Sequence, residues 1–154
     1  LLLVFVCHLG YAQRINGLFN EFGSEKNADC VKVSSFMMSL GKMFAGHDED
    51  AKIIRKIKSI KVLDLESCTA SVKERFNKKV NKLNLKGYDE LMRVNDEGEK
   101  VRVLMKTKKE TIRELLFVCT GKEDCTLVQI NGKFTKDDIN KLVNQETGKK
   151  HGHR

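Results

Sequence analysis

The first half of the chain places its apolar residues mainly at the three-to-four-residue spacing of an amphipathic helix. Four of them predict a short helix that ends at Gly23: Ile15, Leu18, Phe19 and Phe22. A second helix is predicted to begin at Ser34 or Ser35, either of which can cap its first turn, and to end at Gly46. Residues 48–50 are acidic and suit the positive end of a helix dipole, so a third helix is predicted there. Its apolar side carries three isoleucines: Ile53, Ile54 and Ile57.

Two further stretches of this half predict strands, and a longer helix follows them. Residues 30–34 alternate between apolar and polar, whereas residues 60–65 are apolar on both faces, as in the interior of a sheet. The longer helix begins at Thr69 or Ser71, and Ser71 has the spacing from Glu74 that is typical of a capping box. Its apolar stripe consists of Val72, Phe76, Val80 and Leu83.

From Tyr88 onward the apolar residues recur with a period of two, which predicts strands. Four strands are expected, at residues 88–94, 101–106, 112–119 and 126–130. The loops between them are short and polar, which favours hairpins and an antiparallel meander. Thr135 is expected to cap a final helix that has Asp138 in its first turn, with Phe134 and Ile139 spaced as a hydrophobic staple.

This order of elements predicts an α+β fold. We expect a mixed sheet of about six strands, with the C-terminal four strands as an antiparallel meander and the helices packed mainly on one face. The strands at residues 30–34 and 60–65 are separated by helices, so a parallel crossover between them is expected. One domain is predicted over residues 13–147, followed by a flexible basic tail at residues 148–154.

The apolar N-terminal stretch, residues 1–12, is typical of the end of a secretory signal peptide. Small residues at Gly10 and Ala12 favour cleavage before Gln13. The stretch is shorter than the ~20 apolar residues of a transmembrane helix. Cys7 suggests a lipoprotein, but the residue before it is not the small one that lipid attachment requires. We therefore expect an exported protein of the periplasm or outer cell envelope that is not lipidated.

Composition and charge narrow the classes of partner. The chain has 154 residues, of which 40% are hydrophobic and 32% charged, as in a globular domain. Its net charge of +8 gives affinity for anions in general. Aromatic residues make up only 6% and tryptophan is absent, which argues against a nucleic-acid partner. A basic module that contacts anionic lipid or polysaccharide at the membrane surface, without being integral to it, stays an alternative.

Motifs that would define an enzyme are absent from the sequence. It contains no Cys-x-x-Cys pair, glycine-rich phosphate loop, Gly-x-Ser-x-Gly elbow or His-Glu-x-x-His pair. His47 precedes the acidic residues 48–50, but those acids are explained by the start of a helix, and His151 and His153 lie in the tail. The sequence thus predicts no catalytic, cofactor-binding or metal-binding residues. The alternative is an enzyme whose site is assembled from scattered residues.

The cysteines offer one candidate disulfide. Cys119 and Cys125 flank a five-residue loop between predicted antiparallel strands, where they could face each other at bonding distance. The competing interpretation is a pair of half-buried free thiols. Cys30 and Cys68 form a poorer pair, because parallel strands would place them at opposite ends of the sheet.

The predicted second helix is rich in methionine. Met37, Met38, Met43 and Phe44 are candidates for a partner-facing surface, since methionine adapts to varied partners. The same spacing also suits a helix that faces the protein's own core.

Several stretches of the chain resemble one protein family. Residues 87–106, from Gly87 to Lys106, resemble a hairpin of the domain-of-unknown-function family 4252. Other parts follow that family's order as well: Val31–Ser34, Ile60–Cys68, Ile130–Gly132 and Asp137–Ile139. The resemblance covers nearly all of the chain after residue 12 and implies a small, exported, one-domain protein of Gram-negative bacteria. It carries over no activity and no site residues, so we expect a non-catalytic binding domain with an unknown protein partner in the envelope.

Overall fold

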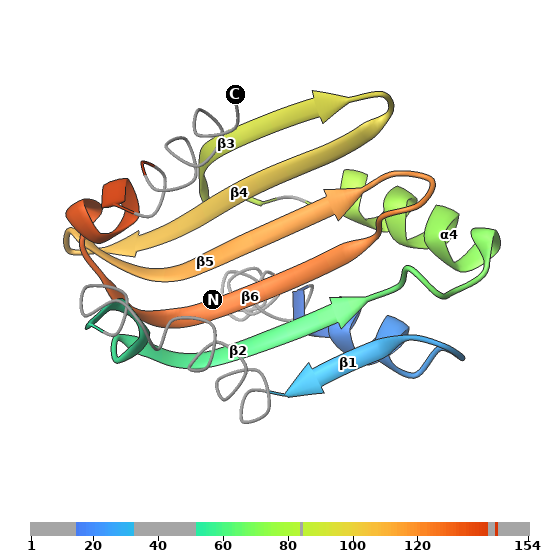
Figure 1. Ribbon diagram of the computed structural model, residues 1–154, viewed down its shortest axis with the longest axis horizontal. Helices are drawn as coiled ribbons and strands as arrows, with labels where there is room; N and C mark the ends of the chain where they lie inside the picture. Colours follow the sequence, from blue (N-terminus) through green and yellow to red (C-terminus); the bar gives the residue numbers. More distant parts are fainter. Residues whose placement is uncertain (1–14, 33–51, 84, 142–143, 145–154) are drawn as a thin grey trace, which may run out of the picture.

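The computed structural model describes residues 15–32, 52–83, 85–141 and 144. Its strands are β1 (Asp29–Lys32), β2 (Ile57–Asp64), β3 (Asp89–Asp96), β4 (Glu99–Lys108), β5 (Thr111–Thr120) and β6 (Thr126–Phe134). Its helices cover residues 15–23, 52–54, 70–81 and 136–141, and the third of these is α4 (Ala70–Asn81). The six strands form one sheet in the order β1-β2-β6-β5-β4-β3 (Figure 1). The predicted α+β class and the meander of the last four strands are confirmed.

The sheet is antiparallel throughout, so the predicted mixed sheet is wrong in this detail. Asp29 at the start of β1 pairs with Asp64 at the end of β2. The chain therefore enters β2 at the end of the sheet where β1 stopped, whereas a parallel crossover would return it to the opposite end. Ile57, predicted in a helix, is the first residue of β2 and pairs with Gly132.

One face of the sheet packs against helix 15–23 and α4. The rings of Phe22 and Phe76 meet edge to face with centroids 5.3 Å apart, which joins the two helices. The predicted α4 stripe is confirmed, because Val72, Phe76 and Val80 are buried and Leu83 packs against them. Thr69, rather than Ser71, caps α4, since its side chain accepts a hydrogen bond from the backbone N–H of Val72.

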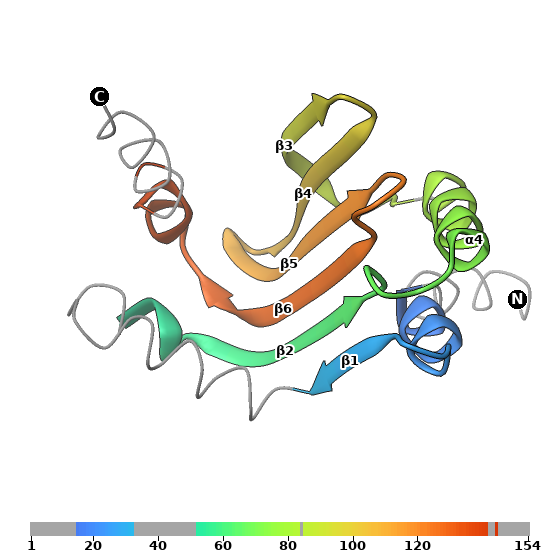
Figure 2. The same ribbon diagram turned by 45° about the vertical axis from the view of Figure 1, so that its right-hand side comes forward.

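The other face carries a second, smaller core beside helices 52–54 and 136–141. Its buried members are Ile53, Ile112, Leu115, Phe134 and Ile139. Leu115 of this core and Leu116 of the larger core are successive residues of β5 and so point to opposite faces, and Figure 2 shows α4 and the helix at residues 136–141 at opposite ends of the curved sheet. The helices of the described residues are thus divided between the two faces, whereas the sequence predicted them mainly on one face.

The start of the final helix forms the predicted capping box and an additional ion pair. The backbone N–H of Thr135 donates to Asp138 Oδ2 at 2.8 Å, and the N–H of Asp138 donates to Thr135 Oγ1 at 3.1 Å. Lys56 Nζ lies 2.7 Å from Asp138 Oδ2, which ties this helix to the segment before β2. Burial alone would raise the pKa of Asp138, but the hydrogen bonds from Lys56 and Thr135 outweigh it and lower the pKa.

This lowered pKa predicts an acid-sensitive contribution to stability. Asp138→Asn is expected to reduce the free energy of unfolding at neutral pH by about 1.5–3 kcal/mol, the range for hydrogen bonds to a charged group. Because the folded-state pKa lies below the unfolded value of about 3.9, the native carboxylate stabilises the fold above that value. The stabilisation is lost as the pH falls through the folded-state pKa. Urea unfolding of both proteins across this pH range measures the difference.

The neighbouring Asp137 provides the matched control for this experiment. Within the described residues, its carboxylate makes one exposed ion pair, with Lys141 at 3.5 Å. Asp137→Asn should therefore change stability by less than about 1 kcal/mol. A difference between wild type and Asp138→Asn that stays constant from neutral to acidic pH would contradict the assigned role of Asp138.

Two tight turns fix the pairing of the meander. Glu97 and Gly98 join β3 to β4 with φ values of 47° and 88°, and Lys109 and Glu110 join β4 to β5 with φ values of 49° and 64°. Positive φ at both central residues is typical of the two-residue turns that match the twist of a hairpin. The β3–β4 turn places Asp96 opposite Glu99 and, further along, Arg93 opposite Arg102.

Candidate functional site on the β3–β4 hairpin

The strand register brings two rows of polar and basic residues to the face of the sheet that α4 covers. One row runs across β3, β4 and β5 through Arg93, Arg102 and Val118. The next row runs across the same strands through Asn95, Lys100 and Thr120. Because paired residues on neighbouring strands share a face, these side chains lie together on one side of the sheet.

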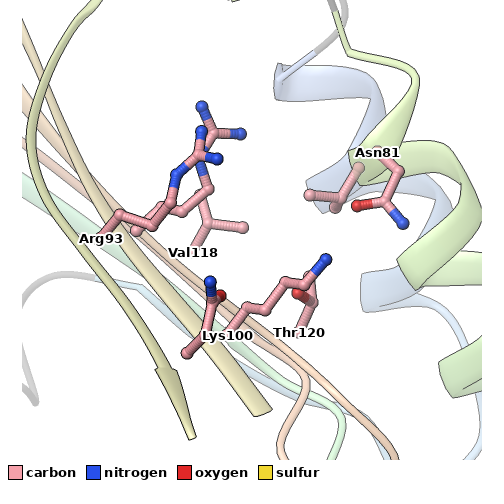
Figure 3. Close-up of a pocket in the computed structure, with 8 residues that line it drawn as sticks. Asn81, Arg93, Lys100, Val118 and Thr120 are labelled. Atoms are coloured by element: carbon pink, nitrogen blue, oxygen red, sulfur yellow. The ribbon is translucent and has the colours of Figure 1, made fainter. Parts of the chain in front are cut away.

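The C-terminal end of α4 closes these two rows into a small hollow. Val80 and Asn81 from α4 complete its lining, and its volume is about 110 Å³. Figure 3 shows Asn81 on α4 across the hollow from Arg93, with Lys100 and Thr120 from the neighbouring strands. This volume is well below the several hundred Å³ of a pocket for a drug-sized ligand, so the hollow has room for a small group only.

Glu90 holds the two arginines of the hollow in place. It accepts from Arg93 Nε at 2.7 Å and from Arg93 Nη2 at 2.9 Å. Arg102 Nε donates to the same carboxylate at 2.9 Å. These hydrogen bonds, first from Arg93 and then from Arg102, lower the pKa of Glu90, and the bond to Glu90 raises the pKa of Arg93. Both guanidinium groups are therefore fixed by one ionised carboxylate.

The positive charge of the hollow exceeds the negative charge around it. Lys100 makes no ion pair with any residue in the described ranges. The adjacent Glu99 does not line the hollow, because successive side chains of a strand point to opposite faces, and its Oε1 accepts from the backbone N–H groups of Lys122 and Glu123 in the β5–β6 loop. Two arginines and one lysine thus face a single carboxylate, and no acidic residue lines the hollow.

The opposite side of the same hairpin is apolar and exposed. Leu91 is 39% exposed, Met92 46% and Val94 45%, and every residue of β3 is exposed. The fourth exposed large apolar residue of the described chain, Val31, lies on β1, the other edge strand. A register shift between Glu90 and Met92 leaves Leu91 as an extra residue, a bulge at the sheet edge.

The predicted disulfide is not formed, and the register explains why. Cys119 pairs with Thr126, so Cys125 lies one position out of register with it. Cys125 is buried in the core on the α4 face, where its Sγ lies 3.3 Å from Asn77 Oδ1, while alternation turns Cys119 toward the other face. Both thiols are free.

Cys30 and Cys68 lie at the same end of the sheet, so their expected separation at opposite ends is wrong. The cause is the antiparallel pairing of β1 with β2, which sets Cys30 opposite Leu63. Cys68 Sγ lies 3.6 Å from the carbonyl oxygen of Lys26 in the turn that precedes β1. Burial is the main cause that raises the pKa of three thiols: Cys68, Cys119 and Cys125. Raised values disfavour the thiolate that a nucleophile or redox cysteine requires.

The remaining candidates of the sequence analysis fall outside the described residues. They are Cys7, Met37, Met38, Met43, Phe44, His47, His151 and His153. Within the described ranges, no three His, Cys, Asp or Glu side chains are placed to hold one metal ion. No helix in these ranges is long and apolar enough to cross a membrane.

The basic hollow was not predicted from the sequence, although one signal for it was present. The net charge of +8 predicted affinity for anions in general but gave no location for it. A two-residue turn at Glu97–Gly98 already implies that Arg93 faces Arg102 and that Asn95 faces Lys100. The part contributed by α4 has no comparable signal, because no turn of fixed geometry links α4 to β3.

These features define a small α+β domain built on one antiparallel sheet, with an exposed edge hairpin that is basic on one side and apolar on the other. Residues 22–142 match the sequence model of a family described as a domain of unknown function, DUF4252. The chain belongs to this family, which confirms the resemblance seen in its hairpin, strand and turn residues. No curated protein and no solved structure matches the chain.

Proposed function

We propose that the protein is an exported domain of the bacterial envelope that acts by binding another envelope protein. The observation that carries this proposal is the exposed apolar edge at β3. Three of its central residues are more than one-third exposed: Leu91, Met92 and Val94. Exposed apolar residues that gather on one edge mark an interaction surface more often than scattered ones do.

The edge position of β3 suggests how such a partner would bind. β3 pairs with β4 on one side only, and its other side ends the described sheet. An extended segment of a partner can add a strand there through backbone hydrogen bonds. Its side chains on the face of Met92 and Val94 would be apolar.

Two features of β3 would restrict the choice of partner. Asp89 and Asp96 place charges at both ends of the strand, and the bulge at Leu91 interrupts the ladder. Such devices limit indiscriminate pairing at natural sheet edges. The net charge of +8 favours an acidic partner through electrostatic attraction.

Export supports the same role but depends on residues 1–12 and not on the folded domain. Their apolar character and the Gly10 and Ala12 positions favour cleavage before Gln13. A protein processed in this way would meet its partner in the periplasm or at the outer envelope.

Site-specific photocrosslinking in the bacterium that encodes the protein tests this proposal. A photoreactive residue at Val94 is expected to capture one envelope protein, recovered with a domain whose N-terminus is Gln13. The matched control is Lys78 on α4, whose side chain is 71% exposed and belongs to a different element from β3. Met92→Lys combined with Val94→Lys should abolish binding of the captured protein to the purified domain.

Three results would contradict the proposal. One is that the photoreactive residue at Val94 captures an envelope protein no more efficiently than the photoreactive residue at Lys78 does. Another is a captured protein whose affinity for the purified domain is unchanged by the double lysine variant. The third is recovery of the protein from the cytoplasm with residues 1–12 retained.

A further inference from the structure

The geometry points to a second binding site in this protein: the basic hollow between α4 and strands β3–β5 binds a phosphate group. This inference does not depend on the proposed protein partner, because the hollow lies on the other face of the hairpin from Met92 and Val94. A phosphate site is a distinct activity, since it selects a small anionic group and not an extended chain.

The positive charges of the hollow repel one another when no ligand is bound. Arg93 and Arg102 lie directly opposite each other on neighbouring strands. Like charges in that position are destabilising. Glu90 offsets one positive charge, but Lys100 in the next row adds another. The group carries two uncompensated positive charges, which the two negative charges of a phosphate monoester would balance.

Hydrogen-bond donors surround the hollow on several sides. Glu90, which does not line the hollow, accepts from Nε and Nη2 of Arg93, and Nη1 makes no hydrogen bond to any residue in the described ranges. Lys100 and Thr120 contribute an ammonium and a hydroxyl from the next row, and the amide of Asn81 faces them from α4 (Figure 3). Donors on several sides suit a tetrahedral oxyanion better than a planar carboxylate.

The size of the hollow suits a phosphate group. Its volume of about 110 Å³ is several times the ~10–15 Å³ of cavity space that holds one water molecule. It admits a phosphate group but not the molecule that carries it. The remainder of the ligand would lie outside the hollow, so the phosphate could belong to a soluble ester or to a lipid headgroup at a membrane surface.

NMR titration of the full domain tests the inference, with inorganic phosphate and glycerol 3-phosphate as probes. At constant ionic strength, millimolar phosphate should shift the side-chain Nε–H signals of Arg93 and Arg102 and the amide signals of Lys100 and Thr120. Acetate at the same concentration should shift them much less. Lys100→Gln should weaken phosphate binding by about tenfold, as expected when one charge-assisted contact is lost.

Lys100→Gln separates the loss of binding from a loss of folding. Lys100 has no ion pair in the described chain, so this change removes the contact to phosphate without breaking the ion pairs of Glu90 with Arg93 and Arg102. Arg102→Gln should reduce affinity at least as strongly. The matched control is Lys78→Gln, which removes the same charge from a surface pair with Glu74 and should leave phosphate binding unchanged.

Phosphatidylcholine vesicles with and without phosphatidic acid distinguish the two sources of the phosphate. Cosedimentation with phosphatidic acid that Lys100→Gln abolishes supports a lipid headgroup, and phosphate binding without cosedimentation supports a soluble ester. The inference would be overturned by an absence of phosphate-induced shifts at the hollow. Equal shifts with acetate, or equal losses in Lys78→Gln and Lys100→Gln, would also overturn it. None of these readouts involves the apolar side chains of Leu91, Met92 and Val94, so failure here leaves the proposed protein partner untouched.

Discussion

Phe76→Ala is expected to destabilise the domain by about 3–5 kcal/mol, the usual cost of removing a fully buried aromatic side chain. Phe76 has no exposed surface and contacts the ring of Phe22 edge to face. Truncation removes the apolar contact and leaves a cavity between helix 15–23 and α4. The free energy of unfolding of a small domain is only about 5–15 kcal/mol, so this single substitution removes a large fraction of it.

Chemical denaturation followed by circular dichroism measures this effect. Phe117→Ala is the matched control, because Phe117 is only partly buried and lies against the smaller core. Its cost should be clearly lower than that of Phe76→Ala. A loss below about 1 kcal/mol for Phe76→Ala would contradict tight packing of the two helices against each other.

Gly132→Ala is expected to destabilise the domain by about 1–3 kcal/mol through overpacking. A Cβ atom at this position would lie 2.4 Å from the carbonyl oxygen of Lys56 and 2.7 Å from ring carbons of Phe134. The carbonyl belongs to the backbone and accepts a hydrogen bond from the N–H of Lys133, so it cannot move aside without breaking that bond. The clash would therefore disturb β6 and the segment that leads into β2.

The substitution of Gly17 by alanine is expected to change stability in the opposite direction. It lies in helix 15–23, and an added Cβ would meet no atom within 4 Å. Gly17→Ala should stabilise the domain by about 0.5–1 kcal/mol, because alanine loses less backbone entropy in a helix. Thermal and urea unfolding of the two variants should shift in opposite directions. A Gly132→Ala protein as stable as wild type would contradict the close approach of Lys56 to β6.

The sequence predicted those parts of the fold that local patterns control. The period-two stretch after Tyr88 located β3, β4, β5 and β6, and short polar loops implied their antiparallel order. Thr135 and Asp138 were predicted as a capping pair, since their spacing determines the contact.

Long-range relationships were not available from local patterns. The direction of β1 relative to β2 depends on where the intervening chain re-enters the sheet, which no turn motif specifies. The same limit affected the cysteines, because a single-residue offset between Cys119 and Cys125 reverses the face on which one of them lies. The basic hollow depends on both kinds of relationship. The turn between β3 and β4 determines which of its strand residues face each other, whereas the position of α4 depends on long-range packing.

The place of β2 in the sheet has a consequence for how the chain folds. The hairpins from β3 to β6 form between neighbours in sequence, whereas β2 pairs with β6 across the whole meander, with Ser59 opposite Asn131. Closing so long a loop costs entropy before its contacts form, and such non-local pairing slows folding. The meander can assemble early and present β6 as a template, and β2 can then dock with α4 and complete the larger core. Until β2 docks, the edge of β6 that β2 later covers is exposed, so an incompletely folded chain can pair there with another chain and misassemble. This hazard is separate from any binding role of the β3 edge in the folded protein.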